Sequence, residues 1–243
     1  MLRHAISAIE IFQKITYGVP LSLVKPGVFY HSFSVQFSPA TSILQKMERL
    51  FYWHIGHDGH LYPLGLFTNN GFWGFNDDYI TGYKLLNLPI EEWLFFFCIP
   101  YACIFTHYAL LELNPKFQFS KKVVNIVYIV LVSVLIITLW YNYNKWYPLV
   151  NFLYVLIPLG LAYNYFRPLL QSFFATYLII LIPFFIVNGI LTGTGIEEPV
   201  VWYNNTENLG IRLLTIPIED TIYNLGMLLT VLLCTEYFNK KTS

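Results

Sequence analysis

Long apolar runs separated by short polar connections dominate the chain from about residue 90 onward. Four stretches, at 93–111, 123–144, 146–166 and 168–196, contain no Asp, Glu, Lys or Arg. A fifth apolar run begins at residue 213 and is interrupted near its start by Glu219 and Asp220. Because a helix needs roughly 20 apolar residues to cross a bilayer, the pattern predicts spanning helices at 90–111, 121–141, 147–166, 169–191 and 215–237.

The composition supports this assignment. Of the 243 residues, 56% are hydrophobic and 12% are charged, with a mean hydropathy of +0.52, whereas about 25% of residues are charged in soluble domains. The net charge is zero, which argues against a nucleic-acid partner. We therefore expect a polytopic protein whose surroundings are the lipid bilayer, with three buried free cysteines and no cleaved signal peptide.

Basic residues indicate how the helices cross the membrane. They follow the first, third and fifth predicted spans, with Lys145 as an exception: Lys116, Lys121, Lys122, Arg167, Lys240 and Lys241. Since loops rich in Lys and Arg remain in the cytoplasm, these ends are expected to be cytoplasmic. The prediction is a multi-pass protein of the cytoplasmic (inner) membrane.

A short motif occurs twice. PIEE at Pro89–Glu92 returns as PIED at Pro217–Asp220, an offset of 128 residues (217 − 89). The same offset aligns further pairs upstream, and Trp73 and Trp202 match after a one-residue shift: Phe75 with Tyr203, Asn76 with Asn204, Gly82 with Gly210, and Leu85-Leu86 with Leu213-Leu214. Duplicated halves of membrane proteins commonly share a site at their interface.

The repeat predicts the domain organisation. Residues 1–66 fit it poorly, 67–115 hold the rest of the first repeat, and 116–243 form the second half. By symmetry we expect two further helices in the first segment. The predicted fold is an all-α membrane protein, one domain of about seven transmembrane helices built from two repeated halves.

The two motifs place Glu91, Glu92, Glu219 and Asp220 where apolar spans begin. Carboxylates are costly in hydrocarbon and therefore indicate function. The structural alternative is a helix start at a wet interface, where Pro and acids are favoured. Against this, six mostly apolar residues precede each acid pair. Neighbouring helical residues point about 100° apart, so both acids of a pair cannot face one cavity equally. A buried carboxyl group keeps its proton more readily, which suits it to protonate a carbon–carbon double bond.

Aromatic residues surround both motifs. Ring faces stabilise cations, although packing and lipid contact are the alternative for any single ring. The candidate residues for contact with a substrate or a cation are Trp73, Phe75, Asn76, Trp93, Trp202, Tyr203 and Asn204. His54, His57 and His60 lack the additional ligands of a usual metal site, so no metal is expected.

The segment 71–102, with its second copy at 201–220, resembles the membrane-bound lycopene β-cyclases, the heterodimeric bacterial type and its fused archaeal and fungal relatives. The resemblance implies conversion of the linear ψ ends of lycopene, or of another linear carotenoid, into β-ionone rings. This is a redox-neutral isomerisation by an intramolecular lyase, with Glu91, Glu92, Glu219 and Asp220 as the acid/base set. No cofactor is expected, since a dinucleotide-binding Gly-x-Gly-x-x-Gly motif is absent from the sequence. Homo- or hetero-oligomers with other carotenoid enzymes are possible partners.

The resemblance fades upstream of Phe67. Family members are expected to carry an apolar span that ends in a Trp-Asp-like pair, whereas Tyr62–Gly65 stand here. We hypothesise that residues from about 20 to 65 derive from a shifted reading frame or are strongly divergent. Translation of the other two forward frames tests this.

Two other functions remain open. A small proton-coupled transporter with repeated halves would also use intramembrane acids, but the predicted spans 123–141 and 169–191 contain few polar residues. A non-catalytic subunit of a heteromeric cyclase is the other alternative.

Overall fold

The computed structural model describes residues 71–241. Its helices are α5 (Ile90–Leu113), α6 (Lys121–Tyr141), α7 (Trp146–Tyr165), α8 (Arg167–Leu191) and α9 (Ile218–Lys241). Each contains a stretch that is long and apolar enough to cross a membrane. The five predicted spans are thus confirmed to within a few residues. The two further helices expected by symmetry fall in 1–66, outside the described residues.

Local sequence explains where several helices begin. Ser120 precedes α6, and its hydroxyl accepts a hydrogen bond from the Val123 N–H at 3.4 Å, as an N-cap residue does. Pro168 occupies the first turn of α8, where proline lacks only an N–H that has no partner in any helix. Proline also lies inside α5, α7 and α8.

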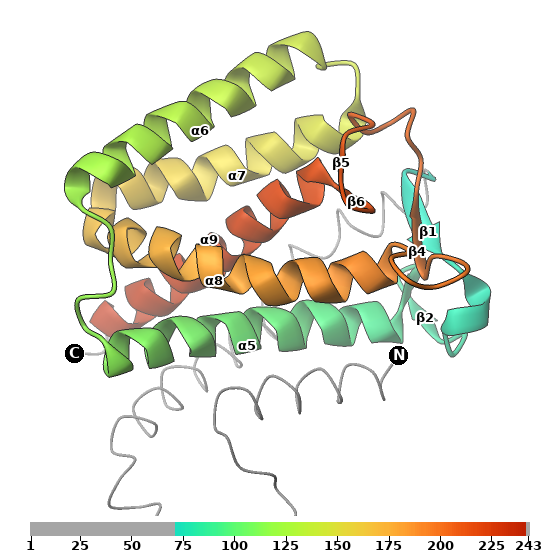
Figure 1. The fold of residues 1–243 in the computed structure, drawn as a ribbon, viewed down its shortest axis with the longest axis horizontal. Coiled ribbons are helices and arrows are strands. Elements are labelled where there is room, and N and C mark those ends of the chain that lie inside the picture. Colours follow the sequence, from blue (N-terminus) through green and yellow to red (C-terminus); the bar gives the residue numbers. More distant parts are fainter. Residues whose placement is uncertain (1–70, 242–243) are drawn as a thin grey trace, which may run out of the picture.

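The helices form a bundle in which α9 lies between α5 and α7 (Figure 1). The most extensive contact is that of α7 with α9, and α8 packs against both α5 and α7. The core between them is aliphatic and aromatic, with Val155, Leu159, Phe173, Leu228 and Leu232 almost inaccessible to solvent. Helix α6 contacts α7 and α8 from the outside and is the least buried of the five.

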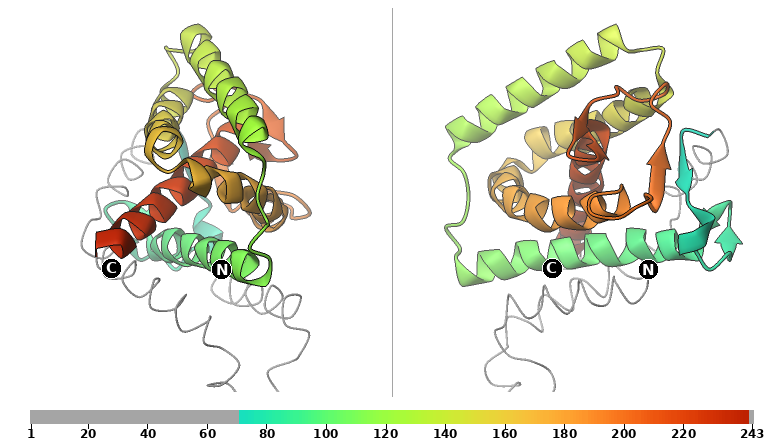
Figure 2. Two further views of the ribbon diagram at one scale, coloured as in Figure 1. Left: turned by 90° about the vertical axis from the view of Figure 1, so that its left-hand side faces the viewer. Right: turned by 45° about the vertical axis from the view of Figure 1, so that its right-hand side comes forward.

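The connections at one end of the bundle contain short strands, and this end is called the hairpin end below (right-hand side of Figure 1). Two hairpins precede α5 and α9: β2 (Lys84–Leu85) with β3 (Leu88–Pro89), and β5 (Arg212–Leu213) with β6 (Ile216–Pro217). The strands β1 (Trp73–Phe75) and β4 (Val201–Tyr203) pair antiparallel, although they lie far apart in the sequence (Figure 2). A short 3-10 helix, η3 (Asp77–Tyr79), follows β1. The all-α prediction therefore holds for the helical bundle and omits these three small sheets.

The Leu-Leu sequence in each hairpin explains why the hairpins were not predicted. Leu86 and Leu214 both adopt positive φ angles, of 50° and 59°, which turn the chain back before each helix. Leu214 is also 73% exposed. An apolar Leu-Leu pair in front of an apolar run is indistinguishable by hydropathy from the start of a helix, so α9 was expected from about residue 215 and begins at Ile218.

The two hairpins are equivalent at the offset of 128 residues. Ile90 N–H donates to the Tyr83 carbonyl at 3.0 Å, and Ile218 N–H donates to the Ile211 carbonyl at the same distance. Both begin after a glycine with positive φ, 84° at Gly82 and 72° at Gly210, a conformation that glycine adopts without strain. The aligned glycines and the pair Leu86 and Leu214 thus share the sign of φ, whereas Asn87 has a positive φ of 63° and its counterpart Thr215 does not.

Candidate active site at the hairpin end

The acid pairs lie at the first turns of α5 and α9, directly after their hairpins. The strand pairing of β1 with β4 ties the two loops to each other. Asn76 N–H donates to the Val200 carbonyl, and Asn204 N–H donates to the Phe72 carbonyl, each at 2.9 Å. At the 128-residue offset Asn76 corresponds to Asn204 and Phe72 to Val200, so each bond is the counterpart of the other with the two copies exchanged. The starts of α5 and α9 are thereby held against one another.

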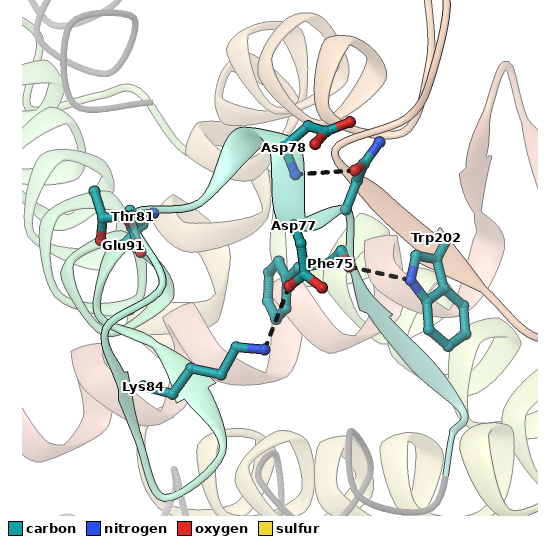
Figure 3. Close-up of polar contacts among 8 residues, drawn as sticks. Phe75, Asp77, Asp78, Thr81, Lys84, Glu91 and Trp202 are labelled. Atoms are coloured by element: carbon teal, nitrogen blue, oxygen red, sulfur yellow. Dashed lines mark hydrogen bonds and ion pairs between the residues drawn. The ribbon is translucent and has the colours of Figure 1, made fainter.

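The first acid of each pair binds its own loop. Oε1 of Glu91 accepts a hydrogen bond from the Thr81 N–H at 2.9 Å, and Oε1 of Glu219 accepts one from the Leu209 N–H at 2.6 Å. Both donors precede their acid by ten residues. Glu91 and Glu219 are buried, at 8% and 0% exposure. Figure 3 shows Glu91 beside Thr81, away from Trp202 and Phe75. The two carboxylates fasten the hairpins to the helix starts.

The second acid of the second pair has two phenol partners. Asp220 Oδ1 accepts a hydrogen bond from the Tyr147 hydroxyl at 2.5 Å, and Oδ2 accepts one from the Tyr203 hydroxyl at 2.6 Å. Tyr147 comes from the first turn of α7 and Tyr203 from the end of β4. Burial and the neighbouring Asp220 carboxylate raise the pKa of Tyr203 well above its usual value, so its hydroxyl remains a donor.

The second acid of the first pair, Glu92, lies near Asp220. The two carboxyl groups lie within electrostatic range of each other, and Glu92 also lies within range of Tyr203 and Tyr223. Glu92 is partly exposed. Within residues 71–241, no hydrogen bond to its carboxyl group is found. The equivalent positions Glu92 and Asp220 thus lie within electrostatic range on two helices that pack together, α5 and α9, in different surroundings.

Aromatic rings pack around this pair. A buried cluster at the hairpin end contains Trp73, Phe96 and Tyr147, with Phe75, Trp93, Tyr203 and Tyr223 packed against it. Tyr147 and Tyr203 contact edge to face, with ring centroids 6.0 Å apart. Phe96 and Tyr223 form a similar contact at 6.2 Å. Such rings present π faces that can stabilise a cation in a dry environment.

Three of the candidate residues lie away from the cluster. The Trp202 side chain covers Gly74, is 43% exposed, and donates from Nε1 to the Phe75 carbonyl at 3.3 Å (Figure 3). Asn76 and Asn204 shape the loops, since their side-chain oxygens accept hydrogen bonds from the Asp78 and Thr206 N–H groups, each at 3.1 Å. Trp93, within the cluster, donates from Nε1 to the Leu85 carbonyl at 3.0 Å.

Tyr147 was missed by sequence reasoning. It is buried, at 8% exposure, and its hydroxyl forms the shorter of the two bonds to Asp220. In the sequence it is one of 19 tyrosines and stands at the start of an ordinary apolar run. No periodicity or motif distinguishes it, because its role depends on the packing of α7 against α9. The histidines at 54, 57 and 60 lie outside the described residues.

Taken together, the helices and this site define a membrane protein with two carboxyl groups within electrostatic range of each other, beside the tyrosines of an aromatic cluster. The sequence model of the lycopene cyclase family matches residues 60–110 and 144–238, more than half of the chain. The chain therefore belongs to the lycopene cyclase family. The interval between the two matched segments contains α6, the least buried helix. No curated protein and no solved structure matches the chain significantly.

Proposed function

We propose that this protein cyclises the linear ends of lycopene, or of a related linear carotenoid, to β-ionone rings. The observation that carries the proposal is the pair Glu92 and Asp220, which lie within electrostatic range of each other beside the tyrosines of an aromatic cluster, in a chain of the lycopene cyclase family. The reaction is an isomerisation by an intramolecular lyase and requires an acid, a base and protection of a cation from water. Family membership supports this function over transport.

The different surroundings of the two carboxyl groups support different roles. Asp220 receives hydrogen bonds from two phenols, and such donors stabilise a carboxylate anion. Glu92 has no such donor among the described residues and lies within electrostatic range of Asp220, which is the arrangement expected of the acid in an acid/base pair. We infer that Glu92 is the proton donor and Asp220 the base.

The chemistry then balances without a cofactor. Glu92 protonates the terminal double bond of the polyene and leaves a tertiary cation on the carbon with two methyl groups. The next double bond attacks this cation and closes the ring, which moves the positive charge to a ring carbon. Asp220 removes a proton from an adjacent carbon and forms the ring double bond. The proton that Asp220 gains must return to Glu92 before the next turnover, which restores both groups to their starting states.

In this proposal, Glu91 and Glu219 hold the loops rather than handle protons. Trp73, Phe75 and Tyr203, with Tyr147, Phe96 and Tyr223, supply the aromatic cluster that would contact the substrate cation. Trp93, Trp202, Asn76 and Asn204 support the loops at the hairpin end. The apolar substrate enters from the lipid, which fits a multi-pass protein of the cytoplasmic membrane with its basic ends in the cytoplasm.

We further infer that the complete bundle has about seven helices in two repeated halves. The equivalent hairpins at 82–92 and 210–220 support a repeat. The family match, which begins at residue 60, supports a boundary near 66 between the poorly matching segment and the rest of the first half. The second half would then extend from 116 to 243.

Expression in a bacterial host that accumulates lycopene and has no other cyclase tests the function. Chromatography of the pigments should show conversion to monocyclic and bicyclic carotenoids. Absence of both products from a chain that reaches the membrane would refute the proposal, and it would leave the non-catalytic subunit as the alternative.

Matched amide variants test the assignment of roles. Glu92→Gln and Asp220→Asn should lower cyclisation about 10²–10⁴-fold, the usual contribution of a general acid or base. Glu91→Gln and Glu219→Gln, one residue away on the same helices, keep the acceptor oxygen and should retain most of the activity. Full activity of both Glu92→Gln and Asp220→Asn would remove the acid/base pair. Loss of activity confined to Glu91→Gln and Glu219→Gln would move the chemistry to the other two acids.

A further inference from the structure

The proposed ring cation can lose a proton from more than one carbon, and the presence of an acid and a base does not by itself decide which proton is lost. After ring closure, three kinds of neighbouring carbon carry a proton: the ring carbon attached to the polyene, the ring methylene and the attached methyl group. Removal of the first proton gives the β ring, removal of the second gives the ε ring, and removal of the third gives a ring with an exocyclic double bond. Each path releases one proton to the base, so the position of the base decides the product.

We propose that Tyr147 is a specificity-determining residue that fixes the orientation of the Asp220 carboxylate and thereby selects which proton is removed. The inference rests on the proposed cyclase function. Its basis is the paired hydrogen bonds at 2.5 and 2.6 Å, one to each oxygen of Asp220. A carboxylate bound at one oxygen can still rotate about its side-chain bonds, whereas binding at both oxygens fixes its plane.

Tyr147 and Tyr203 are each held in place by backbone contacts of their own. The N–H of Tyr147 donates to the Glu207 carbonyl at 3.3 Å, and the adjacent Lys145 donates from Nζ to the Asn208 carbonyl at 2.6 Å. Tyr203 is held by the pairing of β4 with β1, opposite Trp73. The two phenols thus reach Asp220 from separate elements, the start of α7 and the strand β4, and the loop that follows β4 holds the start of α7 in place.

The repeat provides an internal comparison. At the offset of 128 residues, Phe75 corresponds to Tyr203 and Glu92 to Asp220. The phenyl ring of Phe75 has no hydroxyl to donate, so the strand of the first copy provides no hydrogen bond like that of Tyr203 to Asp220. The two phenol bonds are therefore a feature of the proposed base and not of the motif in general. This is the difference expected if the base needs a fixed orientation and the donor does not.

The test is the ring composition of the products, because a purely structural role would change their amount and not their type. Tyr147→Phe retains the buried ring and removes only the hydroxyl. Tyr203→Phe removes the donor to the other oxygen. Tyr154→Phe is the matched control, since Tyr154 lies on the same helix as Tyr147 but donates to the Thr230 hydroxyl at 3.1 Å.

In the lycopene-accumulating host, Tyr147→Phe should lower the ratio of β rings to other ring types about tenfold or more, as expected for loss of a hydrogen bond to a charged group. Tyr154→Phe should leave the ratio unchanged. If Tyr147→Phe forms only β rings, or forms no ring at all while Tyr154→Phe remains active, the inference fails and the cyclase function stands. If the unaltered chain forms no rings, the proposed function itself fails.

Discussion

Gly226 permits the close contact of α7 with α9 on which the position of Asp220 depends. A Cβ atom at Gly226 would lie 2.5 Å from Cγ2 of Val155 and 3.2 Å from Cε1 of Tyr154. Small residues at such positions are what allow membrane helices to approach closely. We therefore predict that Gly226→Ala destabilises the protein and displaces Asp220, which lies at the start of the same helix.

The magnitude follows from this geometry. Carbon atoms pack at about 3.5–4.0 Å, so the new methyl group and Val155 must separate by about 1 Å. Val155 is fully buried and is β-branched, which restricts its rotation. Overpacking of this kind costs about 1–3 kcal/mol. The gain in helix propensity from Gly to Ala, about 1 kcal/mol, offsets part of it.

Substitution of a second glycine, Gly160, controls for the gain in helix propensity from Gly to Ala. Gly160 lies inside α7, and a Cβ atom there would meet no atom within 4 Å outside its own helix. Gly160→Ala therefore gains propensity without a clash. The free energy of unfolding, measured by denaturant titration in detergent micelles, should be lower for Gly226→Ala than for Gly160→Ala by about 1–3 kcal/mol.

Val155→Ala tests whether the named contact is the cause. Alone, it should destabilise by leaving a cavity. Combined with Gly226→Ala, it should cost less than the sum of the two single changes, since the added methyl group takes the space of Cγ2, one of the two methyl groups that Val155→Ala removes. Equal stability of Gly226→Ala and Gly160→Ala would refute the reasoning, as would strict additivity with Val155→Ala.

Two further predictions concern the residues around the acid pair. Glu219→Ala should lower the free energy of unfolding by about 1–3 kcal/mol because the Leu209 N–H loses its acceptor, whereas Glu219→Gln keeps an acceptor; equal melting temperatures would contradict this. The pKa of Tyr203 is raised in the folded protein, while a tyrosine in the unfolded chain ionises near about pH 10. Its contribution to stability is therefore complete below about pH 10 and is lost as the pH rises further. Tyr203→Phe should lessen the fall in stability in alkaline solution, and an unchanged alkaline profile would assign that fall to other groups.

The helices could be predicted from the sequence because each is a run of about 20 residues with almost no charge, and in lipid such runs have few alternatives to the helix. The hairpins could not. Leu213 and Leu214 are as apolar as the helix that follows, yet they are 38% and 73% exposed. Hydropathy records the preference of a side chain for an apolar environment and contains no information on the sign of φ.

The pairing of β1 with β4 shows a second limit. The repeat predicted that the two aromatic loops are equivalent, and their hydrogen bonds confirm this. Equivalence does not predict that the loops pair with each other, because two copies can as readily stand apart. The pairing of β1 with β4, together with the exchanged Asn76 and Asn204 N–H bonds, joins the loops that precede the two helix starts.

The different contacts of the two acids in each pair could be predicted from the sequence only in part. Neighbouring helical positions diverge by about 100°, so one acid of each pair had to face elsewhere. Which one does so depends on the loop: the N–H groups of Thr81 and Leu209 lie where the first acid can reach them. The sequence alone treats all four acids alike.

A doubled motif in this chain therefore does not imply a doubled site. Each copy uses its first acid to fasten its own hairpin and contributes its second acid to one shared space. Two identical contributions would give two equal carboxyl groups with no preferred direction for a proton. The exchange of Phe75 for Tyr203 at equivalent positions, and the presence of Tyr147 beside Asp220, make the two acids unequal. In the proposed reaction, this inequality gives the proton its direction, from Glu92 through the substrate to Asp220. The divergence of the two copies is thus as necessary to the mechanism as their duplication.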